Sequence, residues 1–332
     1  MNYIDFIIFI GFCKTIVVLR NKIQFAQIMN KLHREPFLPD PKRGGKIEEK
    51  LIKKCVWITT VQTSIYWLCG GCSVLGTILY SLFERLTHSD YHYWQLPYGP
   101  LTFVNMTYSP NFEIVWCYQC VSFCLVAVTY TSIDSLVAAI LAHTCYQFKI
   151  LQNCVRSYGK TDHETKKVEN TTDSSSGLQA TLKRIVDYHT AIFDVIEEME
   201  AIFNKLLLTQ FTGTLCYLCI CAYQATEVID AARLLRHLLE AVCIILQVLL
   251  ICYWGEQLYS ESEKVGFAAY ESHFIGTKFS FQKSIAFIIR RSQNPAQLTA
   301  GKFAVVGFLT FAWILRTSYS AFFMLRQVKM KQ

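Results

Sequence analysis

Long stretches without charge are the feature that most limits how this chain can fold. Five of them contain at most one Asp, Glu, Lys or Arg each: residues 55–83, 114–142, 206–226, 241–255 and 303–325. A helix needs about 20 largely apolar residues to cross the hydrocarbon core of a bilayer. A stretch of this kind would expose too much apolar surface in water, so the pattern predicts a membrane protein.

The composition supports this prediction, because only 17% of the residues are charged, against about 25% in soluble domains. No alternation typical of a β-barrel is present, which leaves helices as the structure that can cross lipid. A shorter apolar stretch near the N-terminus carries Asp5 and Lys14 and is the weakest candidate. We therefore predict an all-α integral membrane protein, a multi-span helical bundle that forms one domain over residues 1–332, with six spans at about residues 3–19, 55–83, 114–142, 204–226, 237–256 and 303–325.

Lys and Arg gather in alternate loops and so predict the orientation. Residues 20–54 contain ten of them, whereas residues 84–111 contain only Arg85. Cytoplasmic loops carry the excess of positive charge. This predicts an extracellular C-terminus, an extracellular N-terminus, cytoplasmic loops at residues 20–54, 143–203 and 257–302, and outer loops at 84–113 and 227–236. Asn105, followed by Met106 and Thr107, is a glycosylation candidate in an outer loop.

Two apolar stripes at helical spacing predict that helices continue beyond the membrane on the cytoplasmic side. The first stripe follows the first span and contains Ile23, Ala26, Met29 and Leu32. The second precedes the fourth span and contains Ile185, Ile192, Ile196, Met199 and Phe203.

Isolated polar residues inside the spans need partners. Asp134 is costly in lipid, and a buried structural partner or a place near the cytoplasmic interface is favoured over a proton relay. Arg316 must snorkel to the interface or meet water. Cys69 and Cys72 have a metal-like spacing, but without clustered His the interpretation is packing between helices. We expect no enzyme activity, no cofactor, no metal and no nucleic-acid partner.

The C-terminal stretch resembles the end of insect odorant receptors. The shared patterns are Ser-Gln-x-Pro at 292–295, Thr-Ala-Gly-Lys-Phe at 299–303, Phe-x-x-Ile-Leu at 311–315 and Ser-Tyr-Ser at 318–320. Looser similarities, such as Leu-Pro-Tyr at 96–98, run over nearly the whole chain. Family members have seven spans and an extracellular C-terminus, so the resemblance implies that this sequence lacks the family's first helix.

The resemblance implies the tuning subunit of an odorant-gated, nonselective cation channel. Such a subunit works with an odorant co-receptor in a hetero-tetramer, in the dendritic plasma membrane of an olfactory neuron. Its last helix would line the ion path, and a hydrophobic constriction would gate it by dewetting. One face of that helix provides the pore candidates, with Ile314 as the constriction: Val306, Thr310, Ile314 and Thr317.

The family's ligand pocket lies in the outer half of the bundle and binds a small volatile hydrophobic molecule between mostly apolar walls. The residues that the predicted orientation places there are Tyr3, Phe6, Cys72, Leu75, Leu79, Phe112, Trp116, Gln119, Phe123, Leu238, Ala241 and Val242.

Alternatives from other classes remain open at this point. A gustatory receptor of the same superfamily would end in a different Thr-Tyr motif, whereas residues 317–320 read Thr-Ser-Tyr-Ser. A metabotropic receptor acting through a G protein would need a cytoplasmic C-terminus. A secondary transporter would show inverted repeats and broken helices, and neither is evident.

Overall fold

The structure is a computed structural model. It describes the backbone of residues 3–40, 43–87, 94, 96–97, 109–168, 172–226, 231–272, 274 and 279–330. Within these ranges the side chains are described except those of residues 3–7, 158–168, 172–179, 225, 231–233 and 328–330.

The described residues form helices almost throughout, with one short hairpin. The elements are α1 (Tyr3–Arg20), α2 (Lys22–Leu32), α3 (Gly45–Thr87), α4 (Asn111–Val168), α5 (Thr172–Ala225), α6 (Ala231–Tyr270), α7 (Phe279–Ser292), β1 (Thr299–Ala300), β2 (Ala304–Val305) and α8 (Phe308–Met330). Five helices, α3 to α6 and α8, are long and apolar enough to cross a membrane. The predicted all-α, multi-span class is thus confirmed.

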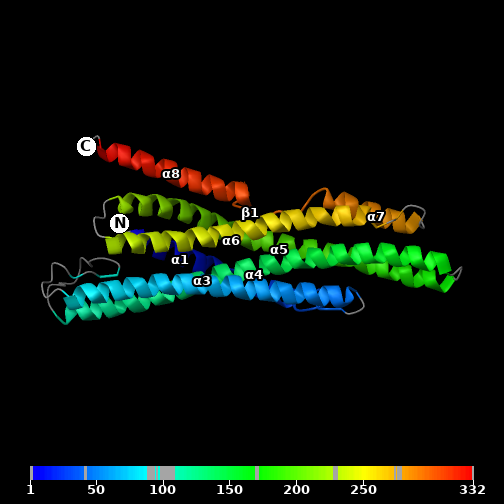
Figure 1. The fold of residues 1–332 in the computed structure, drawn as a ribbon, viewed down its shortest axis with the longest axis horizontal. Coiled ribbons are helices and arrows are strands. Elements are labelled where there is room, and N and C mark those ends of the chain that lie inside the picture. Colours follow the sequence, from blue (N-terminus) through cyan, green and yellow to red (C-terminus); the bar gives the residue numbers. More distant parts are fainter. Residues whose placement is uncertain are drawn as a thin grey trace.

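Four long helices determine the shape of the molecule. Helices α3, α4, α5 and α6 run side by side along its long axis, and both termini lie at one end (Figure 1). They contain 43, 58, 54 and 40 residues, two to three times the ~20 that a bilayer requires. Each is therefore a membrane span that continues as one rod into a region predicted to be cytoplasmic.

The N-terminal helices correct part of one predicted apolar stripe, because Ile23 and Ala26 are exposed whereas Leu32 is buried and Met29 packs against the core. Asn21 separates α1 from α2, and the side chains that α2 buries are Phe25, Ile28 and Leu32. Ile23, from the predicted stripe, is 67% exposed. The predicted stripe on α5 is confirmed, because all five of its residues are buried.

The start of the last span also differs from the prediction at residue 303. Residues 299–305 form an antiparallel hairpin in which Ala300 pairs with Ala304. Gly301 and Lys302 at its turn have φ angles of 64° and 61°, a left-handed conformation that is uncommon for a residue with a side chain. Helix α8 therefore begins only at Phe308.

The carboxylate of Glu256 on α6 accepts a hydrogen bond at the first turn of α8. The backbone N–H of Phe308 donates to Glu256 Oε2 at 3.2 Å. The first N–H groups of a helix have no partner within the helix, and negative charge is favourable there. Glu256 thus joins the end of the hairpin region to α6.

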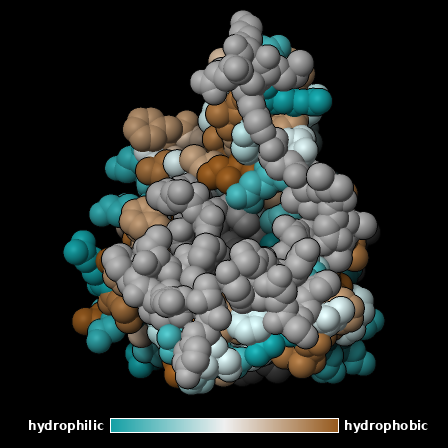
Figure 2. Space-filling model, turned by 90° about the vertical axis from the view of Figure 1, so that its left-hand side faces the viewer, coloured by the Kyte–Doolittle hydropathy of each residue, from teal (hydrophilic) through white to brown (hydrophobic). Residues whose placement is uncertain are grey.

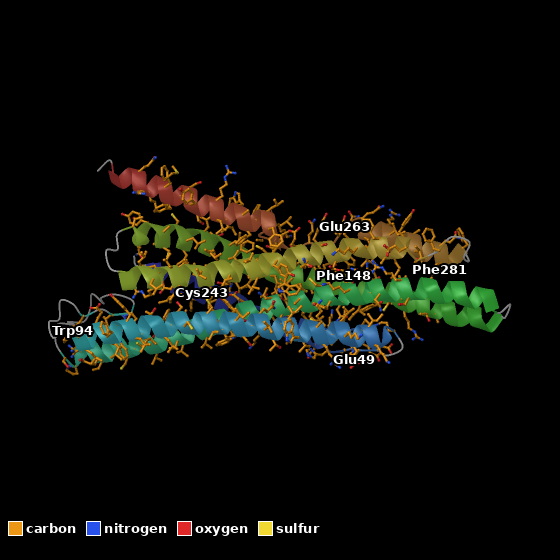
Figure 3. The ribbon with its side chains drawn as sticks, viewed as in Figure 1. Glu49, Trp94, Phe148, Cys243, Glu263 and Phe281 are labelled. Atoms are coloured by element: carbon orange, nitrogen blue, oxygen red, sulfur yellow. The ribbon has the colours of Figure 1, made fainter. Side chains whose placement is uncertain are left out.

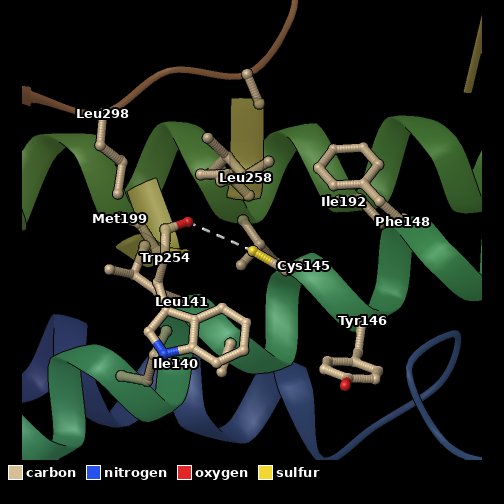
Figure 4. Packing of buried hydrophobic residues seen from close by; sticks show 14 of the residues in the cluster. Ile140, Leu141, Cys145, Tyr146, Phe148, Ile192, Met199, Trp254, Leu258 and Leu298 are labelled. Atoms are coloured by element: carbon tan, nitrogen blue, oxygen red, sulfur yellow. Dashed lines mark hydrogen bonds between the residues drawn. The ribbon is translucent and has the colours of Figure 1, made fainter. Parts of the chain in front are cut away.

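The main apolar core lies where α4, α5 and α6 pack beside the segment before β1. Figure 4 shows Phe148, Ile192, Met199 and Leu258 interlocking there, and the Cys145 thiol donates to the backbone oxygen of Trp254 at 3.6 Å. Apolar side chains also reach the outside, as the end view shows (Figure 2). Leu68, Leu75 and Leu125 are each at least 60% exposed, as expected of lipid-facing positions.

Candidate functional site

A buried ion pair lies in the middle of the helix bundle. Lys14 Nζ on α1 is 2.7 Å from Asp134 Oδ1 on α4, and the two side chains are 0% and 4% exposed. Gln247 on α6 donates to the same carboxylate, and Tyr66 on α3 lines the same cavity as Asp134. The predicted buried structural partner of Asp134 is confirmed, and it is Lys14, one of the two charges that made the first span the weakest candidate.

The network extends to α5 through Tyr130. The ammonium of Lys14 lies 3.8 Å from the centre of the Tyr130 ring, a favourable cation–π geometry. The Tyr130 hydroxyl donates to Gln210 Oε1 at 3.3 Å, and Gln210 donates to Thr214 at 3.3 Å. Side chains from α1, α3, α4, α5 and α6 therefore meet at a single polar centre.

A small cavity adjoins this polar centre. It has a volume of about 10 Å³ and is lined by Gln62, Tyr66, Asp134, Ser135 and Gln247, among others. Gln62 Nε2 and Ser135 Oγ are buried without a hydrogen-bond partner within the part of the chain that the structure describes. A cavity of this size accommodates one water molecule, and Gln62 and Ser135 both lie on its wall.

The structure brings together part of the predicted ligand pocket. Phe123 on α4, Ala241 on α6 and Ile8 on α1 pack against the buried α5 cluster of Tyr217, Leu218 and Cys221. Phe112 and Gln119 are 3% exposed, and Trp116 is half-buried. The side chains of Tyr3 and Phe6 lie outside the described part.

The other predicted pocket residues do not face the bundle interior. Five are exposed: Cys72, Leu75, Leu79, Leu238 and Val242. The interior side of α3 carries Ser73, Thr77 and Ser81 instead, all at most 8% exposed. The prediction therefore chose the wrong face of α3. The reason is that apolar residues of a membrane span can face lipid as readily as protein.

Three polar contacts in the predicted outer half were missed. The Trp116 indole N–H donates to Ser81 Oγ at 2.8 Å. The Tyr217 hydroxyl lies 3.3 Å from Glu240 Oε2, and His237 Nδ1 lies 3.8 Å from the same oxygen. The sequence offered two signals for these contacts. Hydroxyl residues repeat every four positions along α3, at Ser73, Thr77 and Ser81, and Glu240 directly precedes the uncharged run at 241–255 on α6.

The four pore candidates lie on different sides of the α8 region. Val306 precedes the helix, and Val306 and Ile314 are 2% and 1% exposed within their own subunit. Thr310 and Thr317 are half-buried. A constriction must face away from its own subunit, so the structure does not support Ile314 as that residue.

The uncovered face of α8 is largely apolar. It carries Leu309 at 89% exposure, Trp313 at 58% and Tyr319 at 68%, and the exposed Arg316 lies among them. The glycosylation candidate Asn105 lies outside the described residues, so its modification stays a prediction.

Comparisons with known proteins give the same picture. The sequence profile described as 7tm Odorant receptor matches residues 2–319. Odorant receptor 85c of Drosophila melanogaster is 23% identical over an alignment 348 residues long including gaps, which covers 100% of this chain and 82% of that relative. Putative odorant receptor 92a of the same species is 27% identical over 199 residues, 60% of this chain and 46% of that relative. For this second protein the alignment thus spans less than half of the relative's length.

A solved structure shares the fold. The structure of the insect olfactory receptor OR5 from Machilis hrabei in complex with eugenol aligns with a TM-score of 0.82 at 18% identity, covering 96% of this chain and 78% of that chain. A second structure of the same receptor aligns with a TM-score of 0.83 at 17% identity. The fold agrees with the family profile, and the chain therefore belongs to the 7tm odorant receptor family, a family of receptors rather than of enzymes.

Proposed function

We propose that this chain is the odorant-tuning subunit of an odorant-gated, nonselective cation channel that works with a co-receptor. Besides the family membership, the observation that carries the proposal is the poor coverage of α8. Only 11% of its span is buried by the rest of the chain, against 22–56% for the other four spans. A helix left so open needs lipid, water or other subunits around it, as a helix beside an ion path would have.

We place the pore-lining surface on the edge of α8 that carries Thr310, Trp313 and Thr317. The two threonines are half-buried and Trp313 is 58% exposed, so this edge borders the face that packs on the subunit. Hydroxyls can solvate a passing ion, and a bulky apolar ring can form a constriction that gates by dewetting. Trp313 therefore replaces Ile314 as the proposed constriction.

The charge of Arg316 favours a mixed complex. This exposed residue lies one turn beyond Trp313 on the uncovered face of α8. Four guanidinium groups around one pore would repel cations, whereas few copies beside co-receptor subunits would repel them less. The long helices α4 to α6 would assemble the cytoplasmic anchor of this hetero-tetramer, in the dendritic membrane of an olfactory neuron.

The proposed ligand is a small hydrophobic odorant bound in the outer half of the bundle. The described walls there are the apolar cluster around Phe123, Tyr217 and Ala241. Mostly apolar walls with a few polar groups are typical of small-molecule sites. Here Glu240 and the Tyr217 hydroxyl would supply the polar contacts to the ligand.

Current recording tests this function. Cells would express the chain alone, a co-receptor alone, or both, and would be exposed to a panel of volatile compounds while G-protein signalling is blocked. We expect an odorant-evoked cation current only where both subunits are present, with a ligand profile that the co-receptor alone lacks. A response that disappears with the G-protein block would instead support a metabotropic receptor.

The identity of the constriction gives a second prediction. Replacing Trp313 with alanine should produce a current without odorant, because removal of the ring widens and wets the proposed gate. Replacing Ile314 with alanine should instead lower the amount of folded protein, since truncation of a buried aliphatic side chain costs about 2–5 kcal/mol. Resting current and surface labelling of both variants separate these outcomes, and a leak from Ile314→Ala alone would reverse the assignment.

A further inference from the structure

Two cysteines from different helices lie in contact in the seam between α3 and α6. Cys69 Sγ and Cys243 Sγ are 2.9 Å apart, and both side chains are half-buried. A disulfide requires a sulfur–sulfur distance of about 2.05 Å, so an approach of about 0.9 Å would complete the bond. Cys243 lies on α6 where this helix runs alongside α3 (Figure 3).

Contacts on both sides hold this part of the seam together. The Trp254 indole N–H on α6 donates to Gln62 Oε1 on α3 at 2.8 Å. Toward the opposite end, the Arg236 guanidinium of α6 lies 5.6 Å from the centre of the Tyr80 ring of α3. Cys69 lies between Gln62 and Tyr80 in the sequence, and Cys243 lies between Arg236 and Trp254. The two antiparallel helices thus keep one register along the seam, and the thiols stay opposite each other.

We propose that Cys69 and Cys243 form a redox modification site whose disulfide fastens α3 to α6. The co-reactant is a hydroperoxide, ROOH, for which hydrogen peroxide is the simplest example. One thiolate attacks the peroxide, forms a sulfenic acid and releases ROH. The second thiol displaces water from the sulfenic acid, which forms the disulfide. In total, two thiols and ROOH give one disulfide, ROH and water, and the sulfurs lose the two electrons that the peroxide gains.

The spacing in the sequence groups Cys69 with Cys72, whereas the structure places Cys69 beside Cys243. Cys69 and Cys72 are three residues apart on α3, but Cys72 is exposed while Cys69 points toward α6. Cys72 is therefore the matched control, because it shares the helix and the membrane depth of Cys69 without the contact seen for Cys69. The bond would hold the seam in the arrangement seen here, so motion of α3 against α6 would be lost.

Peptide mapping of the purified full-length chain tests the site directly. The chain is exposed to hydrogen peroxide, its free thiols are blocked with N-ethylmaleimide, and it is digested without reductant. We expect the Cys69 peptide to be linked to the Cys243 peptide, with the link removed by dithiothreitol and retained in Cys72→Ser. Cys69→Ser and Cys243→Ser should each lose it. The proposal is overturned if both thiols of folded wild-type protein are alkylated after peroxide treatment, or if Cys72 is linked instead.

A second experiment measures the effect on gating and rests on the proposed function. Peroxide should reduce the odorant-evoked current of the co-expressed wild type, and reductant should restore it. Cys69→Ser should be insensitive, whereas Cys72→Ser should respond like the wild type. An unchanged wild-type current despite a confirmed link would refute the loss of motion. A failure of the proposed function would show as no current in any sample, and the peptide map would still decide the chemistry.

Discussion

Replacing Lys14 with methionine should cost about 3–5 kcal/mol of stability and remove most of the protein from the cell surface. The change leaves the Asp134 carboxylate in the bundle without its cation, although Gln247 still donates to it. A buried charge without a partner is among the most destabilising defects in a protein. Surface biotinylation and thermal unfolding of the detergent-purified chain would measure the loss.

The double variant Lys14→Met with Asp134→Asn is the control for this prediction. It removes both charges and leaves similar volumes, and a buried pair replaced as a unit is often neutral. We therefore expect expression and stability close to those of the wild type, with Lys14→Met alone as the worse variant. If the single and the double variant lose equal stability, the contribution of Lys14 lies in packing rather than in charge.

Replacing Gly255 with alanine should destabilise the protein, although alanine normally strengthens a helix. The added Cβ would lie 2.4 Å from the Val306 backbone oxygen and 2.7 Å from its side chain. Backbone cannot move aside as a flexible side chain can, so α6 and the hairpin region must separate. Overpacking of this kind costs about 1–3 kcal/mol. Thermal unfolding and the amount of monodisperse protein would report it.

Gly71 and Gly76 on α3 are matched controls, because a Cβ at either position would meet nothing within 4 Å. Alanine there should be neutral or stabilise the helix by about 0.5–1 kcal/mol. A Gly255→Ala variant as stable as Gly71→Ala would show that the close approach of α6 to Val306 is not required for folding.

The comparison of α3 with α5 shows what apolar periodicity can predict. The α5 stripe was correct because that part of the helix also carries charged residues, such as Asp194 and Glu197, which mark the outer face. On α3 the whole span is uncharged, and lipid accepts Leu75 and Leu79 as readily as the interior would. In such a span the small hydroxyl residues indicate the interior, because they need partners that lipid does not provide.

Pairings between distant segments could not be predicted at all. Lys14 weakened the prediction of the first span, yet it is 0% exposed and paired with Asp134, 120 positions away. The late start of α8 has a different origin, since Ala304 and Val305 are apolar enough for a span but pair with β1, which lies only a few residues earlier in the chain. In the first case the deciding partner lies in another part of the chain, and in the second the pairing depends on the left-handed turn at Gly301 and Lys302, which a count of apolar residues does not show.

Helix α6 joins the outer end of the bundle to the start of α8. It carries Glu240 beside Tyr217, Gln247 at the ion pair and Glu256 at the first turn of α8. Glu240 and Glu256 are about 24 Å apart along the axis at 1.5 Å per residue. A helix of this length moves as a nearly rigid body, so a tilt or rotation at one end also moves the other end. Under the proposed function, a ligand that moves one end of α6 would therefore also move its other end, which contacts the α8 region through Glu256 and Gly255.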